Sequence, residues 1–422
     1  MVKPFHQLFP VILGITILIA WGTNRLPADE LPNIVLIISD DQHWGDYGFM
    51  GHPVVQTPCL DKLSQEGLVF TRGYVPSSLC CPSLATIVTG MYPHRHGITG
   101  NDPPQPMLQG RDILIERMRN LPALPRLLAE KGYLSMQTGK WWMGPYDSGG
   151  FTHGMTRGER HGDDGLIIGR KTMQPISDFL DLAAKEEKPF FLWYAPMLPH
   201  DPHDPPQRLL DHYTDKTDSI HQARYWGNVE RFDETCGQLM DELDRRGLRE
   251  NTVVVYVCDN GWIQEQKSPG YAEKSKQSQY DGGLRTPIMI SWPGVISPER
   301  NDTDLACSID LVPTLLRIAG IQPAAELPGI DLLDEKAVAE RKAMYGECFT
   351  HDIVDLHDPA KNLRFRWLIA DGWKLIVPQP GEKTGIELYH ILDDPHEERN
   401  LAESQPERVA EMLEKLNTYY AP

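Results

Sequence analysis

Short apolar runs without polar alternation set the strongest limit on the fold of this chain. One run, Asn33–Ser39, stops at two aspartates, and similar runs follow at 190–195, 252–257 and 287–291. Such a run predicts a strand that is buried on both faces, as in a parallel sheet covered by helices. Helical patterns lie between the runs, at 60–66, 124–131, 176–185 and 220–246. This alternation predicts an α/β fold with a large, mostly parallel sheet flanked by helices.

The pattern changes after about residue 345, where short strand-like segments alternate with turn residues. The segments lie at 344–349, 364–371, 373–377 and 387–390, and an amphipathic helical pattern follows at 406–416. We therefore expect a small antiparallel sheet with a helix at the C-terminal end. The predicted organisation is an N-terminal leader at 1–30, a large domain at 31–345 and a small C-terminal subdomain at 346–422.

The N-terminal leader has the pattern of an export signal. Lys3 precedes an apolar run at 8–21, and a polar stretch at 23–30 separates this run from the first predicted strand. The run is short for a membrane span and fits a signal peptide, although an uncleaved N-terminal anchor is an alternative. We expect an exported protein, either periplasmic, secreted or surface-anchored, whose contact with a membrane is limited to that anchor.

The charge balance excludes one class of partner. The chain has 41 Lys and Arg residues against 59 Asp and Glu residues, which gives a net charge of −18. So acidic a surface repels phosphate backbones, and we therefore expect no nucleic-acid partner. The seven cysteines form no C-x-x-C pair, which argues against a disulfide scaffold and against a zinc ribbon.

Two polar pairs directly follow predicted strands and suggest a cation site. Asp40 and Asp41 end the first strand, and Asp259 and Asn260 end another. The carboxyl ends of parallel strands meet at one edge of a sheet, so both pairs are candidates for one crevice. Carboxylate and amide oxygens suit calcium or magnesium better than zinc or copper. Turn formation or helix capping is an equally good explanation of either pair alone.

A cysteine stands at the predicted start of a helix. Pro82 suits the first helical turn, which places Cys80 at or just before the helix N-terminus. The helix dipole there favours an anion and is expected to lower the pKa of a thiol. A buried, inert cysteine is the alternative.

Eight short motifs, in this order, resemble those of the type I sulfatases of the alkaline-phosphatase superfamily. Among them are Cys80-x-Pro82-Ser83 and Gly139-Lys140-Trp141; all eight begin at Ser39, Cys80, Thr89, Gly139, Pro199, Asp259, Lys276 and Glu387. The resemblance extends from about residue 32 to residue 402. It implies an alkaline-phosphatase-like fold and a sulfuric ester hydrolase, arylsulfatase-like in type.

The same resemblance implies a calcium ion and a modified nucleophile. Asp40, Asp41, Asp259 and Asn260 would hold one Ca²⁺. Cys80 would be converted by a formylglycine-generating enzyme into formylglycine, which would complete the metal ligands and attack sulfur. The conversion is chemically reasonable, because a thiolate is a soft ligand in a site of hard oxygen ligands.

Three further residues take roles from the resemblance. Lys140 and Lys276 would bind the sulfate oxygens, and His200 would protonate the departing alcohol oxygen. Without the family context, solvated lysines and a loop histidine are the simpler interpretation.

Two positions depart from the family pattern. Leu84 stands where the pattern has an arginine that supports the nucleophile, and Trp142 stands where it has a histidine that helps to deprotonate it. Leucine has no donor, and indole has only an N–H group. Restoring Arg and His is expected to raise turnover if the loss of these two groups limits the enzyme.

The predicted function is hydrolysis of a sulfate ester, most plausibly on a sulfated carbohydrate. Two alternatives remain open: an impaired homologue that binds a sulfated glycan without cleaving it, and a phosphoester hydrolase on the same metal site. A loop cluster of Arg157, Arg160 and His161 either binds an anionic sugar or is simply solvated.

Overall fold

The computed structural model describes residues 31–104 and 107–422, together with Met1. Apart from Met1, the predicted leader at 1–30 lies outside the described residues. Within the described parts of the chain, none of the helices combines the length and the apolar character that crossing a membrane requires.

A large sheet of eight strands forms the centre of the fold, in the order β5-β4-β6-β1-β7-β8-β2-β9. The strands β5, β4, β6, β1 and β7 are parallel neighbours, whereas β8 is antiparallel to both β7 and β2. The predicted α/β fold with a mostly parallel sheet is therefore confirmed. The eight strands are β1 (Asn33–Ser39), β2 (Leu68–Phe70), β4 (Leu134–Gly139), β5 (His153–Gly154), β6 (Phe190–Ala195), β7 (Thr252–Cys258), β8 (Ile288–Ser291) and β9 (Glu299–Asn301).

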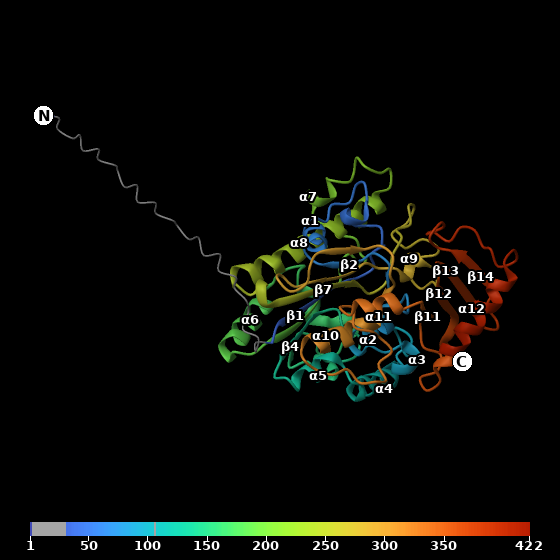
Figure 1. The fold of residues 1–422 in the computed structure, drawn as a ribbon, viewed down its shortest axis with the longest axis horizontal. Helices are drawn as coiled ribbons and strands as arrows, with labels where there is room; N and C mark the ends of the chain where they lie inside the picture. The colour runs from blue at the N-terminus through green and yellow to red at the C-terminus, as the bar shows by residue number, and fades with distance from the viewer. Residues whose placement is uncertain (2–30, 105–106) are drawn as a thin grey trace. The chain divides into compact units, whose positions relative to one another are not determined.

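Helices cover both faces of this sheet, which explains why its central strands are apolar throughout (Figure 1). On one face, Val35 and Ile37 of β1 pack against α1 (Pro58–Glu66), α6 (Gln174–Glu186) and α8 (Ile220–Arg245). On the other face, Ile34 and Leu36 belong to the core formed with four helices. These are α2 (Cys80–Thr89), α4 (Met107–Asn120), α5 (Leu124–Ala129) and α10 (Leu311–Ile318). Four short helices complete the large part: α3 (Pro93–His96), α7 (Gln207–Leu210), α9 (Asp281–Leu284) and α11 (Glu335–Glu340).

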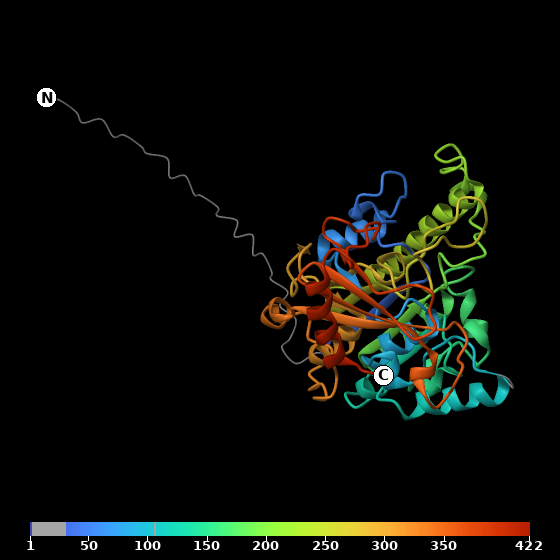
Figure 2. The same ribbon diagram turned by 90° about the vertical axis from the view of Figure 1, so that its right-hand side faces the viewer.

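The C-terminal part is the expected antiparallel sheet with a helix, seen nearest the viewer in Figure 2. It consists of β11 (Ala343–Phe349), β12 (Leu363–Ala370), β13 (Trp373–Pro378), β14 (Glu387–His390) and α12 (Pro406–Tyr419). One face of this sheet, through Trp367 and Ile369, packs on the large part, and the other packs on Met412 and Leu416 of α12.

The two parts share one compact unit, Leu31–Pro422, and the boundary predicted at residue 345 falls within β11. A two-stranded parallel sheet consists of β3 (Gly73–Tyr74) and β10 (Ala306–Cys307). Its residues Tyr74 and Cys307 belong to the same apolar cluster as Trp367 of the C-terminal sheet.

Candidate active site

Four adjacent strands deliver the candidate residues to one edge of the large sheet. The strands β4, β6, β1 and β7 run in the same direction, so their carboxyl ends meet. Lys140 directly follows β4, Asp40 follows β1 and Asp259 follows β7. The two acidic pairs, which the sequence made candidates for one crevice, thus lie at the same edge of the sheet.

The acidic side chains form one buried cluster. Carboxylate oxygens of Asp40, Asp41 and Asp259 lie within 4.8 Å of one another. The amide of Asn260 donates to Asp41 Oδ1 at 2.6 Å, and its backbone N–H donates to Asp259 Oδ1 at 2.7 Å. None of these residues is more than 2% exposed. The cluster thus consists of oxygen ligands shielded from bulk water.

Two buried lysines partly balance this charge. Lys140 Nζ lies 2.7 Å from Asp40 Oδ1 and 3.1 Å from Asp259 Oδ2, and Lys276 Nζ lies 2.7 Å from Asp41 Oδ2. Three carboxylates against two ammonium groups leave one negative charge when all are ionised. A divalent cation reverses the sign to one positive charge, which then attracts a monoanion.

The protonation of the cluster reflects the same imbalance. Burial raises the pKa of Asp259 to about 7, with Asp40 adding to the effect and Lys140 opposing it. Burial alone would also raise the pKa of Asp41, but Lys276, His200 and Lys140 together lower it far below its ordinary value. The interior therefore resists three ionised carboxylates unless further positive charge is supplied.

The donor set fits a calcium ion. Asn260 Oδ1 is buried and has no hydrogen-bond partner among the described residues, so an acceptor oxygen is left for a cation. Carboxylate and amide oxygens are the ligands that hard divalent cations prefer. The four residues that the resemblance predicts as calcium ligands therefore offer a chemically suitable group of oxygen atoms.

Cys80 is the first residue of α2, as its proline predicts, but the expected lowering of the pKa of its thiol is wrong. Burial raises the pKa of the Cys80 thiol to about 11, and this outweighs the lowering by Lys140 and Lys276. Its sulfur, Asp40 and His200 offer ligand atoms within 4.8 Å of one another. The unmodified residue is therefore a neutral thiol beside the oxygen ligands, and it is a poor nucleophile.

His200 completes the predicted set from the loop after β6. Its Nε2 lies 3.5 Å from Asp41 Oδ2, and burial lowers the pKa of the imidazole to about 4. All residues predicted as catalytic or metal-binding thus lie in one place. The three other histidines of the motifs are held by protein partners: His94 by Glu347, His96 by Thr86, and His203 by contacts with Tyr225 and Trp262.

The two departures from the family pattern have different surroundings. Leu84 is completely buried in the same apolar core as Ile34 and Leu36. Trp142 contacts the ring of His161 edge to face, with ring centroids 4.5 Å apart. Leu84 is thus part of the fold, whereas Trp142 lies at the border of the site.

The loop cluster left open by the sequence is divided by the structure. Arg157 forms an exposed ion pair with Asp164. His161, in contrast, lies 6.0 Å from His200, measured between ring centroids. Sequence patterns do not reveal this neighbour, because its position depends on the conformation of the intervening loop.

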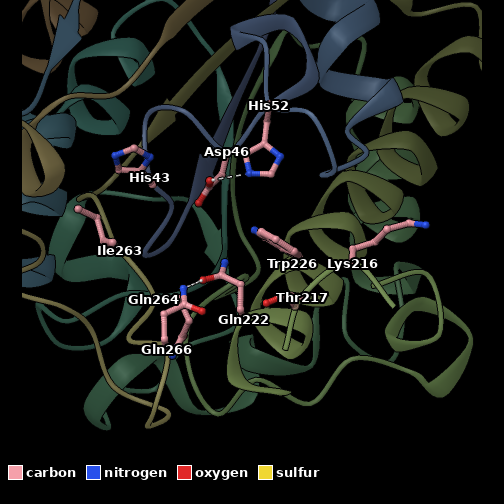
Figure 3. Close-up of a pocket in the computed structure, with 10 residues that line it drawn as sticks. All are labelled: His43, Asp46, His52, Lys216, Thr217, Gln222, Trp226, Ile263, Gln264 and Gln266. Carbon is pink, nitrogen blue, oxygen red and sulfur yellow. Dashed lines mark hydrogen bonds and ion pairs between the residues drawn. The ribbon is translucent and has the colours of Figure 1, made fainter. Parts of the chain in front are cut away.

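A separate polar pocket of about 300 Å³ lies between the loop after β1, the start of α8 and the loop after β7. Figure 3 shows Asp46 facing His52 in it, with 3.6 Å between Oδ1 and Nε2. Tyr225 donates to Asp46, and its ring also contacts that of His203, which follows His200 by three residues.

Comparison with known proteins adds the family context. A family model described as sulfatase matches residues 32–321, and one described as N-sulphoglucosamine sulphohydrolase, C-terminal, matches residues 271–420. The chain is 31% identical to arylsulfatase A of Homo sapiens, over 71% of this chain and 67% of that protein. It is 29% identical to N-acetylgalactosamine-6-sulfatase of Rattus norvegicus, over 76% of this chain and 68% of that protein.

Solved structures with a similar fold include proteins with bound sugars. Ps i-CgsB in complex with k-i-k-neocarrahexaose has a TM-score of 0.75 at 21% identity, and the match covers 92% of this chain and 93% of the other. A protein bound to its substrate D-glucosamine-2-N,6-O-disulfate has a TM-score of 0.72 at 19% identity, with coverages of 92% and 98%. The phosphonate monoester hydrolase of Agrobacterium radiobacter has a TM-score of 0.70 at 17% identity, with coverages of 92% and 95%.

Proposed function

This chain belongs to the sulfatase family, and we propose that it hydrolyses a sulfate ester on a carbohydrate, using one calcium ion and a formylglycine made from Cys80. The observation that carries the proposal is the buried cluster of Asp40, Asp41 and Asp259, which two lysines face. Without a cation, the three carboxylates and two lysines together carry one negative charge when all are ionised. With a divalent cation the cluster attracts a sulfate monoester.

The residues would hold two groups that they do not themselves provide. Asp40, Asp41, Asp259 and Asn260 would hold Ca²⁺, which polarises the sulfate group and stabilises negative charge on its oxygens. Formylglycine at position 80 would provide an oxygen nucleophile and a hard oxygen ligand in place of the thiol.

The protein's own side chains bind and orient the ester. Lys140 and Lys276 are fixed by ion pairs at the sheet edge: Lys140 Nζ pairs with Asp40 and Asp259, and Lys276 Nζ pairs with Asp41. An ammonium group has three N–H donors, so each lysine would keep at least one for a sulfate oxygen.

His200 Nδ1 donates to the backbone carbonyl oxygen of Asp201 at 2.6 Å, which leaves Nε2 on the side of Asp41. To act as the general acid, His200 would carry a proton at Nε2 and pass it to the departing alcohol oxygen. Burial excludes bulk water and strengthens each of these interactions.

The carbohydrate part of the proposal rests on the relatives. Proteins of similar fold bind k-i-k-neocarrahexaose and D-glucosamine-2-N,6-O-disulfate, and curated relatives are N-acetylgalactosamine-6-sulfatases. The partners proposed are a sulfated glycan and, during maturation, a formylglycine-generating enzyme. We also propose export, from the leader pattern at 1–30.

Mass spectrometry tests the proposed nucleophile. The protein is produced with a formylglycine-generating enzyme, and the tryptic peptide of residues 73–95 is examined. We expect an aldehyde at Cys80 and calcium-dependent release of sulfate from a sulfated sugar. A thiol in every copy, under conditions that convert a control sulfatase, would contradict the proposal.

One alternative has a specific observation behind it. The family pattern has an arginine where this chain has buried Leu84, and leucine cannot donate a hydrogen bond. The conversion of Cys80 is therefore the step of the proposal that this departure affects most. If the thiol persists, the same lysines and cation site favour a protein that binds a sulfated glycan without cleaving it. Binding of the sugar without release of sulfate would identify this alternative.

A further inference from the structure

Hydrogen bonds between backbone N–H groups and one of its own carboxylates fix the conformation of the loop that follows β5. The carboxylate of Asp163 accepts from the backbone N–H groups of Arg157, Gly158 and Glu159, at 2.9–3.1 Å. At Gly162 a side chain would meet the carbonyl oxygen of Gly139 at 2.4 Å, so the loop packs closely on the end of β4. The loop therefore has a defined conformation and packs on the sheet next to the candidate site.

This construction places His161 beside the proposed catalytic residues. The residue has a left-handed backbone with φ +69°, and its carbonyl oxygen accepts from the backbone N–H of Trp141 at 3.1 Å. Its ring lies against Trp142 on one side and 6.0 Å from His200 on the other, measured between ring centroids. The strained backbone is thus associated with a side chain directed to the site.

Trp142 has a structural part in this arrangement. Arg160 lies over its ring at 4.7 Å and is itself held by Asp102, at 2.8 and 3.0 Å. The indole therefore supports two consecutive residues of the loop, Arg160 and His161. A histidine at position 142 would offer a smaller surface for both contacts.

The surroundings of His161 keep its ring uncharged. Burial, together with Lys140, Arg160, His200 and Lys276, lowers the pKa of the imidazole to about 3. A neutral imidazole offers one N–H donor and one acceptor nitrogen. The ring of His161 contacts the rings of Trp142 and His200, and it has no side-chain hydrogen bond among the residues that the structure describes.

We propose that His161 is a further substrate-contacting residue of this site, and that its ring N–H donates to an oxygen of the bound sulfate ester. The proposal rests on the proposed function, because it requires a sulfate group between Lys140, Lys276 and the two imidazoles. It also gives a reason for the departure from the family pattern at Trp142. The indole packs against the imidazole of His161, which the loop after β5 places at the site.

Ligand binding without turnover tests this proposal. The full-length, calcium-loaded protein is made without a formylglycine-generating enzyme, and 4-nitrophenyl sulfate is titrated into it calorimetrically. The variants are His161→Asn and His161→Gly, since both residues tolerate a left-handed backbone. Arg157→Ala is the matched control, because Arg157 lies in the same loop and pairs only with exposed Asp164.

We expect both His161 variants to bind the ester about tenfold more weakly, the effect of losing one hydrogen bond to an anion. The control keeps the wild-type affinity, and all variants keep the wild-type melting temperature. Unchanged affinity in a folded His161 variant would overturn the proposal and leave the proposed function intact. Failure of the wild-type protein to bind the ester would also contradict the proposal for His161, whereas release of sulfate from a sulfated sugar by the formylglycine form tests the proposed function separately.

Discussion

At the scale of single residues, Leu84 occupies a motif position that is functional in the family pattern but belongs to the apolar core of this chain. The family pattern places an arginine there, and the sequence alone leads to the expectation that restoring it helps turnover. The structure places Leu84 in the apolar core, one helical turn after Cys80, with no exposed surface. The side chains that pack around Leu84 in that core are apolar.

We therefore expect Leu84→Arg to destabilise the protein by roughly 3 kcal/mol or more, the cost of an unpaired buried charge. Urea unfolding measures the change. Asn120→Arg, at the exposed end of α4, is the control, and it should change the free energy of unfolding by less than about 0.5 kcal/mol. Higher turnover with unchanged stability would show that the core can open to accept the guanidinium.

His96 gives a prediction for the pH dependence of stability. Burial, with nearby His94, lowers the pKa of its imidazole to about 3, whereas the unfolded chain has an ordinary histidine near 6.5. Below pH 6.5 the unfolded state therefore binds a proton that the folded state rejects, and stability falls by about 1.4 kcal/mol per pH unit.

The stability advantage of the wild-type protein over His96→Gln should accordingly shrink by roughly 2 kcal/mol between pH 7 and pH 5. Urea titrations at the two pH values measure this difference. His357→Gln, at an exposed histidine, should show a constant difference. A constant difference for His96→Gln as well would mean that His96 becomes protonated within the fold.

At the scale of elements, the sequence predicted the long apolar strands and missed both the short strands and the half-polar strand β4. The strands β1, β6 and β7 are continuous apolar runs because helices cover both of their faces. The strand β4 escaped notice because Ser135, Gln137 and Thr138 interrupt it, although all three are buried. Their polar groups are satisfied inside the fold, for example by Thr138 donating to Trp193 O at 2.8 Å.

The candidate site divides in the same way. Asp40, Asp259 and their neighbours could be predicted because strand ends are visible as the end of an apolar run. The sequence named His161 only as part of a loop cluster that either binds an anionic sugar or is solvated. Its position beside His200 could not be predicted, because it depends on left-handed backbone conformations and on the hydrogen bonds of Asp163. Such conformations leave only a weak trace in the sequence, as a glycine-rich turn.

The contact between the small sheet and the large part contains a buried ionic group that can be tested. Lys374 of β13 is completely buried and lies 2.7 Å from Asp281 Oδ1 and 2.8 Å from Glu397 Oε1. Replacing it with methionine leaves two carboxylates without a counter-charge. We expect Lys374→Met to lower the free energy of unfolding by about 3–5 kcal/mol.

Chemical denaturation of Lys374→Met and of Lys383→Met, a substitution at an exposed lysine, measures this effect. Equal stability of the two variants would show that Asp281 and Glu397 become protonated at little cost, and that the ionic group does not hold the small sheet in place.

At the scale of the whole molecule, the proposed calcium ion links parts of the chain that are far apart in sequence. Asn260 and Asp41 contact each other across 219 residues. A cation that binds only the folded state stabilises the whole fold, by about 2.7 kcal/mol when its concentration is one hundred times the dissociation constant.

Calcium should therefore raise the melting temperature of the wild-type protein by a few degrees, and removal by a chelator should reverse the change. Asp259→Asn should abolish both the shift and calcium binding measured by calorimetry, whereas Asp215→Asn, at an exposed aspartate, should preserve them. A full calcium shift in Asp259→Asn would remove this residue from the ligand set.

The burial of Cys80 has a consequence for the order of events during biosynthesis. The side chain is 1% exposed, and the backbone N–H of Gln277 closes over the neighbouring segment by donating to Ser78 O at 2.9 Å. A second enzyme cannot reach the thiol once this contact has formed. The proposed conversion of Cys80 to formylglycine would therefore have a limited period, which opens when Cys80 emerges from the ribosome and closes when the segment around Gln277 folds onto it. Under this proposal, copies that fold before they meet the modifying enzyme would retain the thiol, and the rate of folding would set the fraction of active molecules.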